Sequence, residues 1–200
     1  AAWNAKFCRD SGGTNGPPSA WTSCAPPPPN NALSPPPYSA PSPPPAAAPS
    51  SAFTSRSALS AAVNSCLYED PSGENCCSSG VADCGPAGLT DMPDWDVSQV
   101  KNMEGLFTQR TQFNQDISKW HTSQVISMAG MFRGAVIFNA DISGWDVSKV
   151  TDMNYMFSGT HVFNQDLSGW DVGKVNNMNY MFYGATAFDA DITDWNDGQV

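Results

Sequence analysis

Hydrophobic and polar residues recur with a fixed period along the second half of the chain. A tryptophan stands at the start of each period, always 25 residues after the previous one. A constant period of this length is typical of a solenoid, in which one small structural unit stacks on the next. The pattern predicts four complete repeats and the start of a fifth over residues 95–200. The tryptophans are Trp95, Trp120, Trp145, Trp170 and Trp195.

Each repeat contains the patterns of two kinds of element, which we describe by counting positions from its tryptophan. Apolar residues at positions 1 and 3 predict a short strand whose tryptophan and valine point inward. Apolar residues at positions 9, 12 and 13 have helical spacing, with a capping residue at position 8 and usually glycine at position 15. We therefore expect the Trp-x-Val strands to form a parallel ladder, and helices of one or two turns to form the opposite wall. In the third repeat these positions are Trp145, Val147, Asp152, Met153, Met156, Phe157 and Gly159.

Written as a string, the repeat reads W-D-V-S-x-V-x-x-M-x-x-M-F-x-G-A-x-x-F-N-x-D-I-S. This string resembles the BspA-like surface-protein repeat, a relative of the leucine-rich repeats, over residues 85–200. The resemblance implies an α/β repeat fold, a right-handed leucine-rich-repeat-like β/α solenoid, in extracellular or cell-surface proteins that are often adhesive. It supplies no catalytic residues. The second repeat departs from the string, because His121 and Thr122 stand where it has Asp and Val.

One conventional helix is predicted before the repeats, over residues 54–68. Its apolar residues fall at i, i+3, i+4, i+7 and i+8, and Thr54 or Ser55 can cap its first turn. The terminal repeat of a solenoid would otherwise expose its apolar face, so we expect this helix to be the cap. The alternative is an amphipathic helix that binds a partner. The apolar stripe consists of Leu59, Ala62, Val63, Cys66 and Leu67.

Residues 25–50 are rich in proline and should adopt extended polyproline II. Their Ser-Pro-Pro-Pro motifs resemble the extensin-type, hydroxyproline-rich glycoproteins of plant and algal walls, which implies prolyl hydroxylation and O-glycans. The alternative is an unmodified spacer or an SH3-type ligand. No N-x-[ST] sequon occurs. The candidates for modification are Pro26, Pro27, Pro28, Pro29, Ser34, Pro35, Pro36, Pro37, Ser42, Pro43, Pro44 and Pro45.

All six cysteines lie before the repeats. An even number confined to a loop-rich segment predicts disulfides and an oxidising compartment. We expect Cys8 to pair with Cys24, whereas the pairing of Cys66, Cys76, Cys77 and Cys84 is open. A metal site made by the last four is the alternative, but the paired C-x₂₋₄-C spacing of zinc sites is missing. The predicted organisation is therefore a disulfide-containing segment at 1–24, a proline-rich rod at 25–50, a helical, Cys-rich cap at 51–94, and the repeats at 95–200.

The chain is acidic, with 19 Asp and Glu against 9 Lys and Arg and a formal net charge of −10. This balance argues against nucleic acid and anionic membranes as partners. No apolar run approaches the roughly 20 residues that span a bilayer. The chain begins with alanine and without a leader, as a mature secreted chain would. It stops at Val200, early in a fifth repeat, so we expect either more chain or a neighbouring chain that completes the repeat and propagates a filament.

Three polar positions recur in register and are the candidate site residues. Aspartate at position 22 either accepts N–H bonds within its own turn, which we favour, or binds a cation such as Ca²⁺. Asparagine at position 20 has the same two interpretations, with a side-chain ladder favoured. Position 2 should point outward, as a solvated acidic stripe or as a ligand face. Position 22 is Asp116, Asp141, Asp166 and Asp191, position 20 is Asn114, Asn139, Asn164 and Asp189, and position 2 is Asp96, His121, Asp146 and Asp171.

No catalytic constellation is recognisable. The two histidines, His121 and His161, occupy different repeat positions, and the motifs of nucleophilic, zinc or phosphate-binding enzymes are missing. We predict a non-enzymatic, extracellular structural or adhesive glycoprotein that needs no cofactor and assembles with other protein chains and glycans. A Ca²⁺-dependent module that binds glycans or proteins is the alternative.

Overall fold

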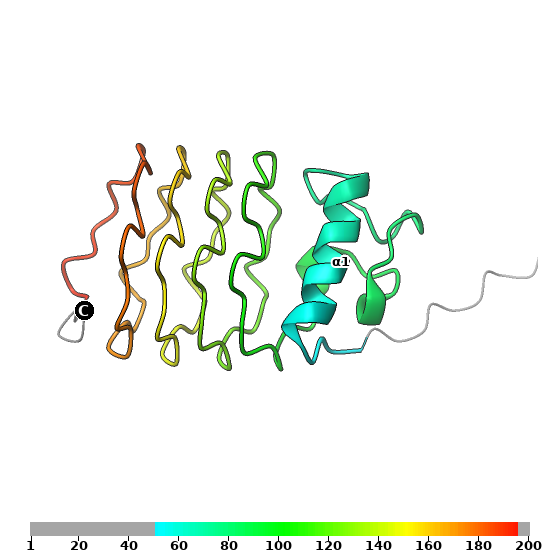
Figure 1. Ribbon diagram of the computed structural model, residues 1–200, viewed down its shortest axis with the longest axis horizontal. Helices are drawn as coiled ribbons and strands as arrows, with labels where there is room; N and C mark the ends of the chain where they lie inside the picture. Colours follow the sequence, from blue (N-terminus) through cyan, green and yellow to red (C-terminus); the bar gives the residue numbers. More distant parts are fainter. Residues whose placement is uncertain (1–50, 196–200) are drawn as a thin grey trace, which may run out of the picture. The chain divides into compact units, whose positions relative to one another are not determined.

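The computed structural model describes residues 51–195, which belong to one compact unit, Pro44–Val200. Within residues 51–195 there is one α-helix, α1 (Arg56–Glu69), and two 3₁₀ helices, η1 (Gly85–Ala87) and η2 (Met92–Asp94), and no regular strand (Figure 1). The expected Cys8–Cys24 pair and the proline-rich segment lie outside the described residues.

Helix α1 matches the predicted helix to within two residues at its start. Ser55 is its N-cap, and its hydroxyl accepts the N–H of Ala58 at 3.2 Å. The N–H of Asp70 closes the last turn on the carbonyl of Cys66 at 2.9 Å. The face of the helix that is buried is the predicted stripe, Leu59, Ala62, Val63, Cys66 and Leu67.

Two disulfides, Cys66–Cys76 and Cys77–Cys84, connect α1 to the segment that follows it. Their Cα atoms are 5.1 and 5.9 Å apart, within the range that a disulfide spans. These two bonds settle the pairing that the sequence left open among these four cysteines. They also occupy the thiols that the alternative metal site would need.

Helix α1 packs against the first repeat. The guanidinium of Arg56 donates two hydrogen bonds to the carbonyl of Glu104, at 3.1 and 2.6 Å. Arg110 of the first repeat donates to the side chain of Asn64 at 2.6 Å. Just before the helix, the fully buried ring of Phe53 lies 5.1 Å from that of Trp95. The helix and its disulfide-bonded loop therefore cover the outer side of the first repeat (Figure 1).

The repeats lie side by side, each against the next (Figure 1). Parallel bridges join position 8 of consecutive repeats, from Asn102 to Ser127, Asp152 and Asn177. From there to position 15, every second backbone N–H donates to a carbonyl of the following repeat. In the first repeat the donors are Met103, Gly105, Phe107 and Gln109, at 2.7–2.9 Å. The ladder between repeats therefore runs through the Met-x-x-Met-Phe segment.

The prediction of a short helix in this segment was wrong. The N–H groups that do not reach the next repeat close four-residue turns within their own repeat, such as Leu106 to Met103 and Thr108 to Gly105. A helix would need these groups, and those of the ladder, for bonds to the fourth residue back. So short a segment nucleates a helix poorly on its own. The apolar residues at positions 9, 12 and 13 still point into the core, because turns repeated at this spacing also direct them to one side.

Successive turns require a left-handed backbone at positions 11 and 15. Glycine provides it at Gly105, Gly130 and most of position 15, but Tyr155 and Tyr180 adopt φ of 53° and 57° at position 11. A bulky residue in this region is strained. The guanidinium of Arg133 lies 4.8 Å above the ring of Tyr155, and the ring of Tyr180 stacks on it at 5.0 Å. These contacts hold the two tyrosines in place.

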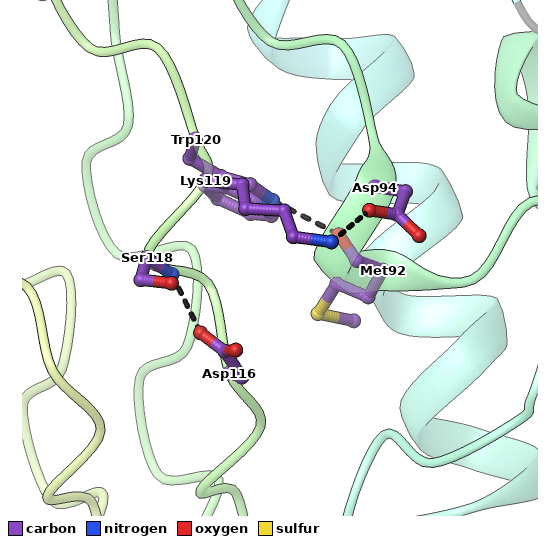
Figure 2. Close-up of polar contacts among 6 residues, drawn as sticks. All are labelled: Met92, Asp94, Asp116, Ser118, Lys119 and Trp120. Atoms are coloured by element: carbon purple, nitrogen blue, oxygen red, sulfur yellow. Dashed lines mark hydrogen bonds and ion pairs between the residues drawn. The ribbon is translucent and has the colours of Figure 1, made fainter.

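The Trp-x-Val wall is buried as predicted, but it has no backbone ladder. The four tryptophans of the complete repeats are only 3–4% exposed. Among the described residues, no backbone hydrogen bond joins one Trp-x-Val segment to the next. Instead, from the second tryptophan on, each indole N–H donates to a carbonyl 28 residues earlier, as Trp120 does to Met92 at 2.9 Å (Figure 2). Trp145 donates to Ile117 in the same way at 3.1 Å. A row of side-chain bonds therefore replaces the strand pairing that we expected.

Aromatic rings fill the space between the two walls in three stacks. The tryptophan rings are 6.3–6.5 Å apart between centroids in the pairs Trp95–Trp120, Trp120–Trp145 and Trp170–Trp195. The phenylalanines of position 13 repeat at 5.5–5.7 Å and those of position 19 at 5.9–6.0 Å. Within a repeat the two phenylalanines are 3.9–4.1 Å apart. The leucine-rich-repeat-like β/α class stays a prediction, since the described repeats contain neither a helix nor a regular strand.

The buried tryptophan row predicts a large effect of truncation. Trp145→Ala removes a buried side chain that stacks on Trp120 of the preceding repeat, and should lower the free energy of unfolding by about 3–5 kcal/mol. Trp145→Phe, which keeps a ring but loses the bond to Ile117, should cost less. Tyr68→Ala is the control, because its side chain is 83% exposed, and it should change stability by no more than about 0.5 kcal/mol. Urea unfolding measures all three, and a Trp145→Ala variant as stable as the control would contradict the buried row.

Candidate functional site: the polar columns and a recess beside the second repeat

The aspartates of position 22 are exposed and bonded within their own turns. Each carboxylate accepts the N–H of the residue two positions on, at 2.9 Å from Ser118, Ser143 and Ser168 and at 3.0 Å from Thr193. Figure 2 shows the first of these bonds, between Ser118 and Asp116. The hydroxyl of Ser143 also donates to Asp141, and that of Thr193 to Asp191, both at 2.7 Å. This is the turn geometry of the favoured interpretation. In the described part of the chain, the group of side chains that converges closely enough for a metal is Cys66, Cys76 and Cys77, and it contains no aspartate.

These turns lower the pKa of the carboxyls. The hydroxyl of the residue two positions on contributes most for Asp116, Asp141 and Asp166, and the backbone N–H contributes most for Asp191. Both favour the ionised form. Charges of neighbouring aspartates in the column oppose them, as those of Asp116 and Asp166 do at Asp141. The pKa is lowered despite this repulsion, so the turn bonds outweigh it.

Position 2 is also exposed and repeats the same turn with one interruption. The carboxylates of Asp96, Asp146 and Asp171 accept the N–H two residues on at 3.0–3.1 Å. Bonds from the following serine are the main cause of the lowered pKa of Asp96 and Asp146. His121 interrupts the column, and its neighbour Thr122 is buried and donates to the carbonyl of Asp146 at 3.0 Å.

The asparagines of position 20 form the side-chain ladder that was favoured. The side-chain oxygen of Asn114 accepts the N–H of Asn139 at 2.7 Å, and that of Asn139 accepts the N–H of Asn164 at 2.9 Å. The next step runs from Asp189 to Asn164 at 2.8 Å. An amide oxygen that already accepts a backbone N–H of the next repeat is a structural group. The ladder therefore serves cohesion between repeats.

The surface is hollowed beside the second repeat. Two open recesses, of about 480 and 470 Å³, lie on either side of Lys119 and His121, and both residues line both. The ammonium of Lys119 is 2.7 Å from a carboxylate oxygen of Asp94, in an exposed ion pair (Figure 2). Asp96 lines the first recess and Asp146 the second. Of the predicted ligand face, the structure therefore brings Asp96, His121 and Asp146 to one hollowed region.

Sequence reasoning missed Lys119. The signal was present in the repeats themselves: position 25 is glycine before the third and fourth tryptophans, at Gly144 and Gly169, and lysine before the second. The same junction carries the departure at His121. Comparing repeats position by position across the junction would have found both residues.

The stacked 25-residue units, with polar columns on their surface, define a repeat protein. Residues 78–200 match the family described as "Mycoplasma protein of unknown function, DUF285", and the chain belongs to this family. No curated protein and no solved structure matches the chain. Among the described residues, no helix is long and apolar enough to cross a membrane.

The lowered pKa values predict a loss of stability in acid. Because these carboxyls have a lower pKa in the folded chain than the usual value near 4 of the unfolded one, the unfolded chain binds more protons in acid. The stability they contribute is fully present above about pH 4 and is lost as the pH falls through their folded pKa. Urea unfolding at pH 6 and at pH 3 measures this loss.

Asp141→Asn and Ser143→Ala isolate one such turn. Each should reduce the difference in stability between the two pH values, because the first removes the titrating group and the second removes the hydroxyl that lowers its pKa. At pH 6 each should cost no more than about 1 kcal/mol, since the turn is exposed. An unchanged pH profile in both variants would show that these turns do not contribute to acid sensitivity.

Proposed function

We propose that this chain is a non-enzymatic extracellular structural or adhesive glycoprotein. Its repeats form a leucine-rich-repeat-like solenoid of the BspA-like kind, and this solenoid packs against other chains in a cell-surface or wall-type polymer or filament. The observation that carries the proposal is the stacking of repeats through identical contacts. Residues at one position form continuous columns, so the array presents long regular faces to a neighbour.

The covalent bonds of the cap support the extracellular location. Disulfides persist in oxidising compartments and are rare where glutathione keeps thiols reduced. Both described disulfides are formed by buried cysteines, each no more than 2% exposed. Such bonds are structural, since a buried sulfur is poorly accessible to reducing thiols.

The exposed carboxylates of the repeats support packing against other chains. Position 2 and position 22 place carboxylates along the surface, each held in orientation by its own turn. Lateral contact between two such acidic faces would be repulsive, so a glycan, a cation or a basic partner must lie between them. The proline-rich segment at 25–50, hydroxylated and O-glycosylated as in extensin-type proteins, would supply glycans.

Cross-linking of the native material tests this proposal. Lys101, Lys149 and Lys174 are exposed on three different repeats, and an amine-reactive cross-linker applied to intact cells should join them to other extracellular chains. Mass spectrometry of the same digest should show proline +16 Da products with pentoses or hexoses in residues 25–50.

The control is the same cross-linking after solubilisation, which should remove the links between chains. Recovery of the chain from the cytosol with free thiols at its cysteines would reject the extracellular assignment. Unmodified proline throughout residues 25–50 would reject the glycoprotein part alone.

The alternative is a Ca²⁺-dependent module that binds glycans or proteins, with the metal at the aspartate columns. Each carboxylate uses one oxygen in its own turn, which leaves the second oxygen free of hydrogen bonds within residues 51–195 and open to a cation. The two proposals differ in what calcium does for the fold.

Chelation separates the two functions. In the structural proposal EDTA leaves the melting temperature unchanged, because the turns satisfy the carboxylates without a metal. In the calcium-dependent alternative EDTA lowers the melting temperature and excess Ca²⁺ restores it. Magnesium added in place of calcium is the control for ionic strength.

A further inference from the structure

The junction before the second repeat differs from the later ones at three neighbouring positions. It reads Lys119-Trp-His-Thr, where the next two junctions read Gly-Trp-Asp-Val. Repeats within one chain are each other's reference, because they occupy equivalent places in the same array. The last junction, Asp194-Trp-Asn-Asp, departs as well, but Lys119-Trp-His-Thr is the junction of this kind that lies between complete repeats. The tryptophan is retained there, so the core residue is kept while the exposed residues beside it change.

The fold does not require the departure. A Cβ atom built at Gly144 or Gly169 meets nothing within 4 Å, and neither glycine has a left-handed backbone. Position 25 therefore accepts either glycine or lysine. At position 2, histidine gives up the acceptor that holds the turn at Asp146. Within residues 51–195 the His121 imidazole makes no hydrogen bond in exchange.

The departure coincides with the hollowed surface. Lys119 and His121 stand between the two recesses, and each recess has a carboxylate on its far side, Asp96 in one and Asp146 in the other. Each of these carboxylates is held by a bond of 3.0 Å from its own turn. The site therefore alternates acceptor, donors and acceptor along three consecutive repeats.

The charges in this region leave a small negative excess, because Asp96 and Asp146 have no cationic partner among the residues that line the recesses. Lys119 offsets Asp94, with which it pairs, and His121 replaces a carboxylate of the column. The rest of the position 2 column is acidic, and the whole chain carries −10. A ligand that needs both donors and acceptors but carries no charge fits such a region. Sugar hydroxyls donate to carboxylates and accept from ammonium and imidazole N–H groups.

We propose that the two recesses beside Lys119 and His121 together bind an uncharged oligosaccharide, laid across the first three repeats. This inference rests on the adhesive part of the proposed function and gives it a site. Asp96 and Asp146 accept hydrogen bonds from sugar hydroxyls, and Lys119 and His121 donate to sugar oxygens. An acidic glycan is disfavoured, because Asp94, Asp96 and Asp146 would repel it while the one lysine is already paired.

Titration of the oxidised full chain with oligosaccharides of defined charge tests the site. We would use neutral oligomers of glucose, mannose, galactose and arabinose, with oligogalacturonate as the acidic comparator, all in EDTA. The indole N–H signals of Trp95 and Trp120, which line the recesses, report binding by NMR. At least one neutral oligomer should shift them in a saturable manner.

The key variant restores the repeat pattern. Lys119→Gly with His121→Asp makes this junction resemble the later ones, so it should fold as well as the parent and weaken binding by about tenfold or more, the effect expected from losing a charged hydrogen bond. Lys101→Gly removes an exposed lysine that lines neither recess and should leave the affinity unchanged.

Three outcomes would overturn the inference: no neutral oligomer binds the parent, the acidic comparator binds in their place, or the restored junction binds as well as the parent. None of these bears on whether the native chain is cross-linked to other extracellular chains. Conversely, a cytosolic chain with free thiols would remove the proposed function even if the recesses bound sugar. The two failures are therefore distinguishable.

Discussion

The structure depends on hydrogen bonds between backbone groups of consecutive repeats. In the Met-x-x-Met-Phe segment, every second N–H donates to the next repeat and the others close turns within their own. An interior backbone group must have a partner, so each repeat completes its bonding only in the presence of its neighbour. Because each ladder segment pairs residue for residue with the same segment of the next repeat, equivalent positions lie side by side. Like side chains therefore stack on like.

Stacking of like on like suits some residue types better than others. Tryptophan and phenylalanine gain from it, since their rings lie nearly parallel at 3.9–6.5 Å throughout the core. Asparagine gains because its amide oxygen reaches the backbone of the next repeat. Aspartate does not gain, because each carboxylate faces another of the same charge. The chain places its aspartates on the exposed side, and a local turn supplies each with donors.

The sequence predicted the period, the buried residues, the cap helix and the presence of disulfides. These depend on local patterns, on apolar spacing or on cysteine number, all of which are visible in one chain. The sequence did not predict the turns at positions 9–15. Consecutive turns and a short helix both place Met103, Leu106 and Phe107 on the same side, so the apolar pattern cannot distinguish them. The difference lies in where the backbone N–H groups donate, which no side-chain pattern records. The pairing of Cys66 with Cys76 likewise depended on how the loop after α1 folds back. Of the candidate site, the columns were predictable but the recess was not, since it needs the positions of Lys119 and Asp94 in space.

The two tyrosines with a left-handed backbone make the stability of the repeats differ along the array. Position 11 is glycine in the first two repeats and tyrosine in the next two, and each tyrosine in this conformation costs about 1–3 kcal/mol. The contact of Arg133 with the Tyr155 ring and the stacking of the two tyrosine rings offset part of that cost. The first repeat, in contrast, is covered by α1, and two disulfides stabilise the cap to which that helix belongs. Because nearest-neighbour contacts alone transmit stability through such an array, local opening should be polarised. Fraying is then confined to the third and fourth repeats, and the end held by the cap acts as the template on which they re-form.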